Sequence, residues 1–221
     1  MSRTLLSRLV LCAALLGGVS YVAGWFLDLP PGLSTAWKGT GVGLLAVYAA
    51  LNARSLDGWM LAGVMAFGAL GDVLLETHGL IVGALAFLAG HLTAIGLYLR
   101  NRRPDTAPRH LAMAALLFVT ITGVAYLLPP DRAGAPGIAL YASGLAAMTA
   151  CAFLSRFPRA LVFAGALMFA VSDLLIFLRT GRPALDGFPM GLAVWGLYFG
   201  GQTLIALGVV RTLEERPIQL S

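Results

Sequence analysis

Charged residues are scarce in this chain of 221 residues. Asp, Glu, Lys and Arg together make up 11% of it, whereas soluble domains carry about 25%. Hydrophobic residues make up 59%, and the mean hydropathy is +0.86. These values exclude an ordinary soluble domain and indicate a membrane protein with several spans, each of which needs roughly 20 apolar residues.

The alternating apolar and polar pattern of barrel strands is also missing. Backbone groups inside lipid must find hydrogen bonds within the protein, and continuous apolar runs achieve this as helices. Eight such runs can be counted, at about 5–27, 33–51, 58–76, 79–100, 110–128, 136–154, 158–179 and 188–212. Because the joints between them are short, we expect residues 1–221 to form a single all-α domain, a bundle of eight transmembrane helices.

Motifs of cofactor and zinc sites are absent as well. The chain has no Walker loop, no dinucleotide fingerprint and no G-x-S-x-G nucleophile elbow. Its two cysteines, Cys12 and Cys151, lie within apolar runs, where small buried hydrophobes are expected rather than a disulfide. No group of Cys and His residues has zinc spacing, so the sequence predicts no cofactor and no bound metal.

Basic residues are distributed unevenly between the two ends of the predicted helices. With the N-terminus inside, eleven fall in inner segments, namely Arg3, Arg8, Arg54, Arg100, Arg102, Arg103, Arg109, Arg156, Arg159, Arg211 and Arg216. Four fall in outer segments, namely Lys38, Arg132, Arg179 and Arg182. Inner loops of membrane proteins carry the excess of Lys and Arg, so both termini are predicted to be cytoplasmic. The net charge of +5 is spread over separate segments and indicates no nucleic-acid partner.

Carboxylates inside the predicted spans are the strongest functional signal. Of ten in the chain, Asp72 and Asp173 alone lie well inside spans. A charge at the centre of a span costs about 2.5–3.5 kcal/mol on insertion scales, so a partner, a proton or a use must offset it. Both residues lie at similar depth in spans that run outward, so the two helices can face each other across a shared cavity. A structural pair without catalytic use is the alternative.

Further polar side chains lie near the two aspartates in the predicted topology. They are Lys38, Glu76, His91, Tyr141, Ser172, Tyr198 and Gln202. Each also has a plain structural interpretation. His91 and Gln202 would form interhelical hydrogen bonds, worth about 0.6 kcal/mol each. Lys38 would reach the headgroups, the tyrosines would pack, Ser172 would bond to backbone, and Glu76 would be a solvated loop residue.

Together these segments resemble those of the YhhN-type lysoplasmalogenase family of multi-pass membrane proteins. Residues 70–98, LGDVLLETHGLIVGALAFLAGHLTAIGLY, resemble its first signature, with Asp72 and then Phe87 to His91. The other matching positions are Lys38, Tyr141, Met148, Ser172-Asp173 and Tyr198 with Gln202. The resemblance covers about residues 35–212. Gly39 stands where the family usually has Pro, and Leu80 where it commonly has Phe.

The resemblance implies hydrolysis of the vinyl-ether bond of lysoplasmalogens, which releases a fatty aldehyde and glycerophospho-ethanolamine or -choline. Vinyl ethers hydrolyse by protonation at carbon, which gives an oxocarbenium ion that water captures. The reaction needs an acid, an anion and a base, and two close carboxylates can supply all three. Asp72 and Asp173 are therefore the expected catalytic pair. Which of them carries the proton stays open, because a coupled pair titrates as a unit.

The remaining polar residues are the expected substrate-binding set. We expect Lys38 to bind the phosphate of a lysophospholipid and His91, Tyr198 and Gln202 to position water or the glycerol hydroxyl. Tyr141 and Ser172 complete the set. The predicted partners are this substrate and membrane lipid, in a bacterial inner membrane. The sequence leaves a homo-oligomer open.

Two other functions compete with this interpretation. Paired intramembrane aspartates also suit a proton-coupled transporter of a small lipid-like or anionic solute. A metal-dependent membrane lipid hydrolase is the second alternative, since Asp72, His91 and Asp173 leave a metal site conceivable. A carrier would release no aldehyde from lysoplasmalogen, and a metalloenzyme would be sensitive to chelators.

Overall fold

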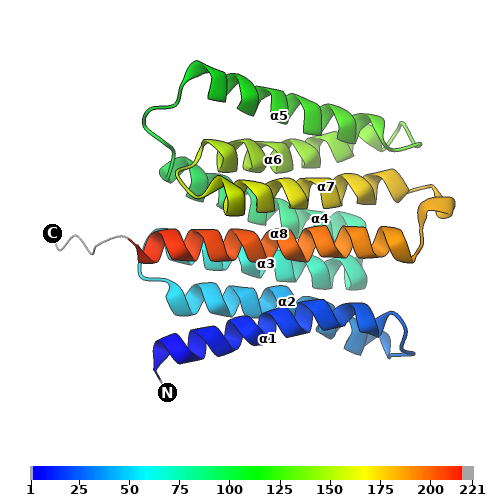
Figure 1. Cartoon of the computed structure of the whole chain (residues 1–221). Coiled ribbons are helices and arrows are strands. Elements are labelled where there is room, and N and C mark those ends of the chain that lie inside the picture. Colours follow the sequence, from blue (N-terminus) through cyan, green and yellow to red (C-terminus); the bar gives the residue numbers. More distant parts are fainter. Residues whose placement is uncertain (1, 216–221) are drawn as a thin grey trace. The chain divides into compact units, whose positions relative to one another are not determined.

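The structure is a computed structural model that describes residues 2–215. In these residues the chain folds into α-helices joined by short loops (Figure 1). The helices are α1 (Arg3–Gly24), α2 (Pro31–Asn52), α3 (Leu56–His78), α4 (Leu80–Arg100), α5 (Pro108–Leu127), α6 (Ala135–Leu154), α7 (Ala164–Arg179) and α8 (Phe188–Glu214). A π-helical turn, Arg159–Phe163, leads into α7, and a 3-10 turn, Pro183–Leu185, precedes α8. The predicted all-α class is confirmed.

Seven helices in this part of the chain are long and apolar enough to cross a membrane, which makes the protein a multi-pass membrane protein. The helix that falls short is α2, although its 22 residues would suffice in length. Four glycines and the polar residues Ser34, Thr35, Lys38 and Thr40 lower its hydropathy. The apolar span expected at 33–51 is therefore a helix without a stretch that is apolar enough to count as a candidate span.

Helix boundaries follow from local sequence. Ser2 and Ser55 are N-caps, and their hydroxyls accept hydrogen bonds from the backbone N–H of Leu5 and Gly58. Pro31 and Pro108 begin α2 and α5 without such a cap, because proline suits the first helical position. The predicted runs and the observed helices consequently agree to within a few residues at most ends.

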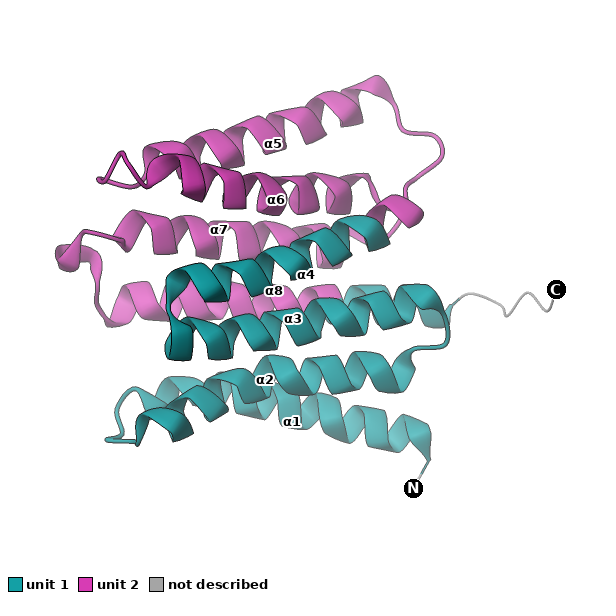
Figure 2. Ribbon diagram, turned by 180° about the vertical axis from the view of Figure 1, so that it is seen from behind, with its two compact units in different colours: residues 1–97, 206–221 teal, residues 98–205 magenta. Residues whose placement is uncertain are grey.

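Two compact units divide the chain, one formed by residues 1–97 with 206–221 and the other by residues 98–205 (Figure 2). Within the first unit, α2 packs against both α1 and α3. Within the second unit, α6 packs against both α5 and α7. The prediction of a single domain over residues 1–221 stays a prediction.

The second unit contains a close contact between α7 and α8. A Cβ atom added at Gly165 would lie 2.5 Å from the carbonyl oxygen of Gly201, and one added at Gly201 would lie 2.6 Å from that of Gly165. Only glycine allows backbones to approach this closely. Elsewhere in the unit, Ala125, Ala142 and Phe177 form a buried apolar cluster between α5, α6 and α7. This packing fixes the helices that carry the predicted site residues of this unit.

Candidate active site

Asp72 is buried on α3 in the first unit, with 2% of its surface exposed. The residue before it, Gly71, meets the ring of Phe87 on α4, where an added Cβ would lie 2.8 Å from the ring atoms. His91 follows Phe87 by one helical turn on α4 and is buried to the same degree. The carboxylate and the imidazole predicted from the first signature therefore come from two helices in direct contact.

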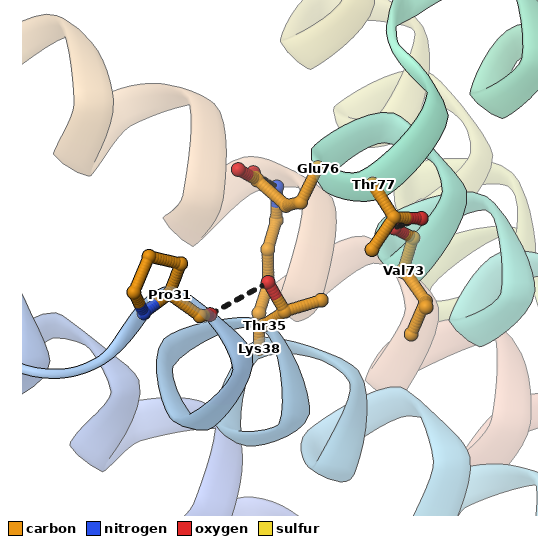
Figure 3. Close-up of polar contacts among 6 residues, drawn as sticks. All are labelled: Pro31, Thr35, Lys38, Val73, Glu76 and Thr77. Carbon is orange, nitrogen blue, oxygen red and sulfur yellow. Dashed lines mark hydrogen bonds and ion pairs between the residues drawn. The ribbon is translucent and has the colours of Figure 1, made fainter.

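Lys38 forms an ion pair with Glu76, with 2.6 Å between Nζ and Oε1 (Figure 3). The helices α2 and α3 come close here because Gly39 faces Val73, whose Cγ2 would lie 3.1 Å from an added Cβ. The Lys38 side chain is 12% exposed and that of Glu76 is 44% exposed. The interpretation of Glu76 as a loop residue is wrong, since it lies in the last turns of α3. The predicted phosphate ligand Lys38 thus already has an anionic partner.

Asp173 lies on α7 in the second unit, with 7% of its surface exposed. The hydroxyl of Tyr141 on α6 donates a hydrogen bond of 2.7 Å to its Oδ2. The Tyr141 ring is held edge-on against Phe177, with 6.0 Å between centroids and 86° between planes. Phe177 follows Asp173 by one helical turn, so an aromatic contact and a hydrogen bond both hold Tyr141 against α7. The structure therefore brings together two of the predicted site residues.

Ser172 donates its hydroxyl to the backbone carbonyl of Val194 on α8, over 2.9 Å. It is fully buried, and this bond ties α7 to α8 beside Asp173. The alternative interpretation of Ser172, a serine bonded to backbone, is the contact that the structure shows, although the carbonyl belongs to the neighbouring helix.

Tyr198 and Gln202 lie one turn apart on α8, and both are buried. The Tyr198 ring packs edge-on against Phe169 of α7, with 5.1 Å between centroids. Gln202 is 1% exposed, and its Oε1 accepts no hydrogen bond from any residue in the described part of the chain. A buried acceptor without a donor costs about 1–3 kcal/mol, which favours a site where a bound molecule supplies one.

The predicted site residues thus fall into two groups. Lys38, Asp72 and His91 belong to the first unit, and Tyr141, Ser172, Asp173, Tyr198 and Gln202 belong to the second. The pairing of Asp72 with Asp173 joins residues of the two groups and stays a prediction. Sequence reasoning missed Glu76 as the partner of Lys38 and Phe177 as the support of Tyr141. No local signal could have found either, because each contact joins different helices.

The side chains of residues 2–215 offer few groups that could bind a metal ion together. Within either unit, no three His, Cys, Asp or Glu residues are grouped so that they could hold a metal ion. Asp72 and His91 would be two donors of the first unit, which is fewer than the three protein ligands that catalytic zinc usually has.

Most of the chain is similar to a known protein family and to two named proteins. The profile described as the YhhN family matches residues 33–209, a range that includes every predicted site residue. The chain belongs to the YhhN family. Two relatives carry the name lysoplasmalogenase, one from Mycobacterium bovis (strain ATCC BAA-935 / AF2122/97) and one from Mycobacterium tuberculosis (strain CDC 1551 / Oshkosh). Each is 30% identical to this YhhN protein over 224 aligned positions, which cover 88% of the chain and 84% of the relative. No solved structure matches the chain.

Proposed function

We propose that this protein is a membrane hydrolase that cleaves the vinyl-ether bond of lysoplasmalogens. Membership of the YhhN family and the two relatives named lysoplasmalogenase support the reaction class. Within the chain, the hydrogen bond from Tyr141 to the buried Asp173 is the observation that carries the proposal. A carboxylate inside an apolar helix is costly, and here it is also held in one orientation, as acid–base chemistry requires.

The proposed reaction uses Asp72 and Asp173 as an acid and a base. The protonated carboxyl delivers its proton to the alkene carbon remote from the ether oxygen, which leaves an oxocarbenium ion. The ionised carboxylate stabilises that cation and takes a proton from the water that adds to it. The resulting hemiacetal collapses to a fatty aldehyde and a glycerophospho-alcohol. The proton that was delivered to carbon is thereby balanced by the one taken from water.

Tyr141 has a positioning role in this proposal. Its hydroxyl occupies Oδ2 of Asp173, while Oδ1 receives no hydrogen bond from the described residues of the second unit. Oδ1 is then the oxygen that handles the proton. Gln202 can accept a hydrogen bond from water or from the glycerol hydroxyl through its unused Oε1. Tyr198 and Ser172 support this arrangement through their contacts between α7 and α8.

Lys38 is proposed to bind the phosphate of the lysophospholipid. Since its ammonium group pairs with Glu76, the phosphate must either replace that carboxylate or share the cation with it. The 44% exposure of Glu76 lets it move away at low cost. The headgroup would then lie at the end of α3, with the vinyl ether deeper along the same helix toward Asp72.

The proposal also includes the arrangement in the membrane. Residues 1–221 form one domain in which α2 completes a set of eight spans, and both termini are cytoplasmic. Because the family relatives are bacterial, the membrane is proposed to be a bacterial inner membrane. In a bundle, α2 can cross the membrane despite its polar residues, since its Lys38 is paired with Glu76.

The decisive experiment is aldehyde release from lysoplasmalogen by purified protein in detergent. Asp72→Asn and Asp173→Asn should each lower turnover by at least about 1,000-fold while the protein stays folded. Asp28→Asn, at an exposed acid outside the helices, serves as the matched control and should retain full activity. Aldehyde release by both Asn variants at the wild-type rate would refute the mechanism. Absence of release by the wild type would favour a transporter, and loss of activity on chelation would favour a metalloenzyme.

A further inference from the structure

One end of the second unit gathers five arginines from two loops, which we call the arginine cluster. Its members are Arg102, Arg103, Arg109, Arg156 and Arg159. The first three lie between α4 and the start of α5, and the other two lie between α6 and α7. Asp105 is the only acidic residue in these two segments. The cluster therefore carries a net charge of about +4 over a small part of the chain.

The two loops are tied together by hydrogen bonds. The backbone N–H of Arg156 donates to the carbonyl of Asn101 over 2.8 Å, and that of Arg103 donates to the carbonyl of Leu154 over 3.2 Å. The guanidinium of Arg156 donates from Nε to the Asn101 side chain over 3.0 Å. Because Asn101 is buried, the cluster stands on a fixed scaffold rather than on independent flexible loops.

Two helix N-termini meet at the same place. The helix that begins at Pro108 and the one that begins at Arg159 both lack a side-chain cap and an acidic residue in the first turn. Phe153 connects them, since the Arg159 guanidinium lies 4.3 Å from its ring centroid and the His110 ring lies 5.9 Å from it. Helix N-termini expose N–H groups and partial positive charge, which favour an anion.

The positive charge of the cluster is not neutralised by the protein. Among residues 2–215, none of the five arginines forms an ion pair with a carboxylate. Burial, followed by the nearby Arg159 guanidinium, lowers the pKa of Arg103. Like charges are thus held close together on a rigid scaffold at the ends of membrane-spanning helices. Such an arrangement favours the binding of an external anion, most strongly at low salt.

We propose that the arginine cluster binds the phosphate group of an anionic phospholipid of the surrounding membrane. Guanidinium groups match phosphate oxygens in a bidentate geometry. The cluster lies at the end of α4, the start of α5, the end of α6 and the π-helical turn that leads into α7. Because these helices are long and apolar enough to cross a membrane, headgroups are expected at their ends. The orientation predicted from the distribution of arginines would place this end of the helices at the cytoplasmic leaflet, where anionic lipids are expected. The cluster shares no residue with the proposed catalytic and substrate-binding set, so the proposal does not depend on the proposed hydrolase activity.

The test is equilibrium binding of fluorescent phosphatidylglycerol to the purified full chain in dodecyl maltoside micelles. The triple variant Arg103→Gln/Arg109→Gln/Arg159→Gln should raise the Kd by about tenfold or more, because each arginine near a surface contributes a several-fold factor. The matched control, Arg132→Gln/Arg179→Gln/Arg182→Gln, removes the same charge from other loops of this unit and should change the Kd less than twofold. Fluorescent phosphatidylcholine should bind weakly and equally to the wild type and to the cluster variant. Added salt should weaken the binding of phosphatidylglycerol to the wild type.

Several results would overturn the proposal. Equal losses in the two triple variants would show that overall charge, not the cluster, attracts the lipid. Displacement of the lipid by an equal concentration of glycerol 1-phosphate would identify a soluble phosphate ester as the ligand instead. If the triple variant does not fold, the exposed Arg109, which makes no side-chain hydrogen bond in the described structure, carries the test. Arg109→Glu should then raise the Kd about tenfold, and an unchanged Kd would refute the site.

Discussion

The carboxyl group of the buried Asp173 is oriented by its neighbours, because Tyr141 donates a hydrogen bond to one carboxylate oxygen and its ring packs against Phe177. A carboxylate that was free to rotate would lose much of the rate that orientation supplies. The ammonium group of Lys38 is likewise held in position by its ion pair with Glu76.

Removing the hydroxyl of Tyr141 tests its positioning role. Tyr141→Phe keeps the ring contact with Phe177 and should lower kcat for lysoplasmalogen by about 10- to 100-fold, since hydrogen bonds to charged groups are worth about 1.5–3 kcal/mol. KM should change little, because Tyr141 does not contact the headgroup in this proposal. The measurement is steady-state aldehyde release with its pH profile. Tyr126→Phe, at an exposed tyrosine of α5, is the control, and an equal effect there would contradict the assignment.

Removal of the charge at Lys38 or at Glu76 tests phosphate binding. Lys38→Ala should raise KM about tenfold with a smaller effect on kcat, because a cation that binds the headgroup is lost. Glu76→Gln removes the competing carboxylate and should lower KM or leave it unchanged. A purely structural ion pair would give a different result: both variants would lower the thermal unfolding temperature and neither would change KM.

At the scale of helices, close contact depends on small residues. The backbones of α7 and α8 meet at Gly165 and Gly201. On α8, Tyr198 lies before Gly201 and Gln202 lies directly after it. The register of α8 against α7 therefore sets the position of both polar side chains. In helix α2, Gly39 allows close packing on Val73 of α3, while the glycines also lower the hydropathy of the helix.

A pair of alanine substitutions on α8 tests the close contact. Gly201→Ala would place a Cβ 2.6 Å from a backbone oxygen, and overpacking of this kind costs about 1–3 kcal/mol. Gly196 has no atom within 4 Å of an added Cβ, so Gly196→Ala should be neutral or stabilising by up to about 1 kcal/mol. Thermal unfolding in detergent compares them. Equal unfolding temperatures would show that α7 and α8 can separate at this contact without loss.

At the scale of the whole chain, composition dictates a multi-pass helical membrane protein, and the distribution of arginines predicts its orientation. Ten of the eleven inner arginines lie in the described residues, whereas Arg216 lies outside them. The arginine cluster suggests a second role for the arginines at this end of the helices. The same residues that orient the chain during insertion are proposed to hold an anionic lipid afterwards.

Cysteine labelling in intact cells tests the orientation. In a Cys12→Ala/Cys151→Ala background, Ala133→Cys probes the loop between α5 and α6, and Asp105→Cys probes the loop between α4 and α5. A membrane-impermeant maleimide should label Ala133→Cys directly and Asp105→Cys only after permeabilisation. The opposite pattern would place both termini outside and would contradict the predicted topology.

The amino-acid sequence by itself determined the helical class, the number of helices and the two acids buried in apolar segments. Lipid explains the helical class, because backbone groups must bond within a helix there. It also makes the two acids conspicuous, because a charge inside an apolar helix needs a partner, a proton or a use. Only the tertiary structure decided which side chains meet. Tyr141 and Asp173 are 32 positions apart, Lys38 and Glu76 are 38 apart, and Asn101 and Arg156 are 55 apart. Such contacts depend on how each helix is rotated and packed against its neighbour, and local composition leaves that rotation undetermined.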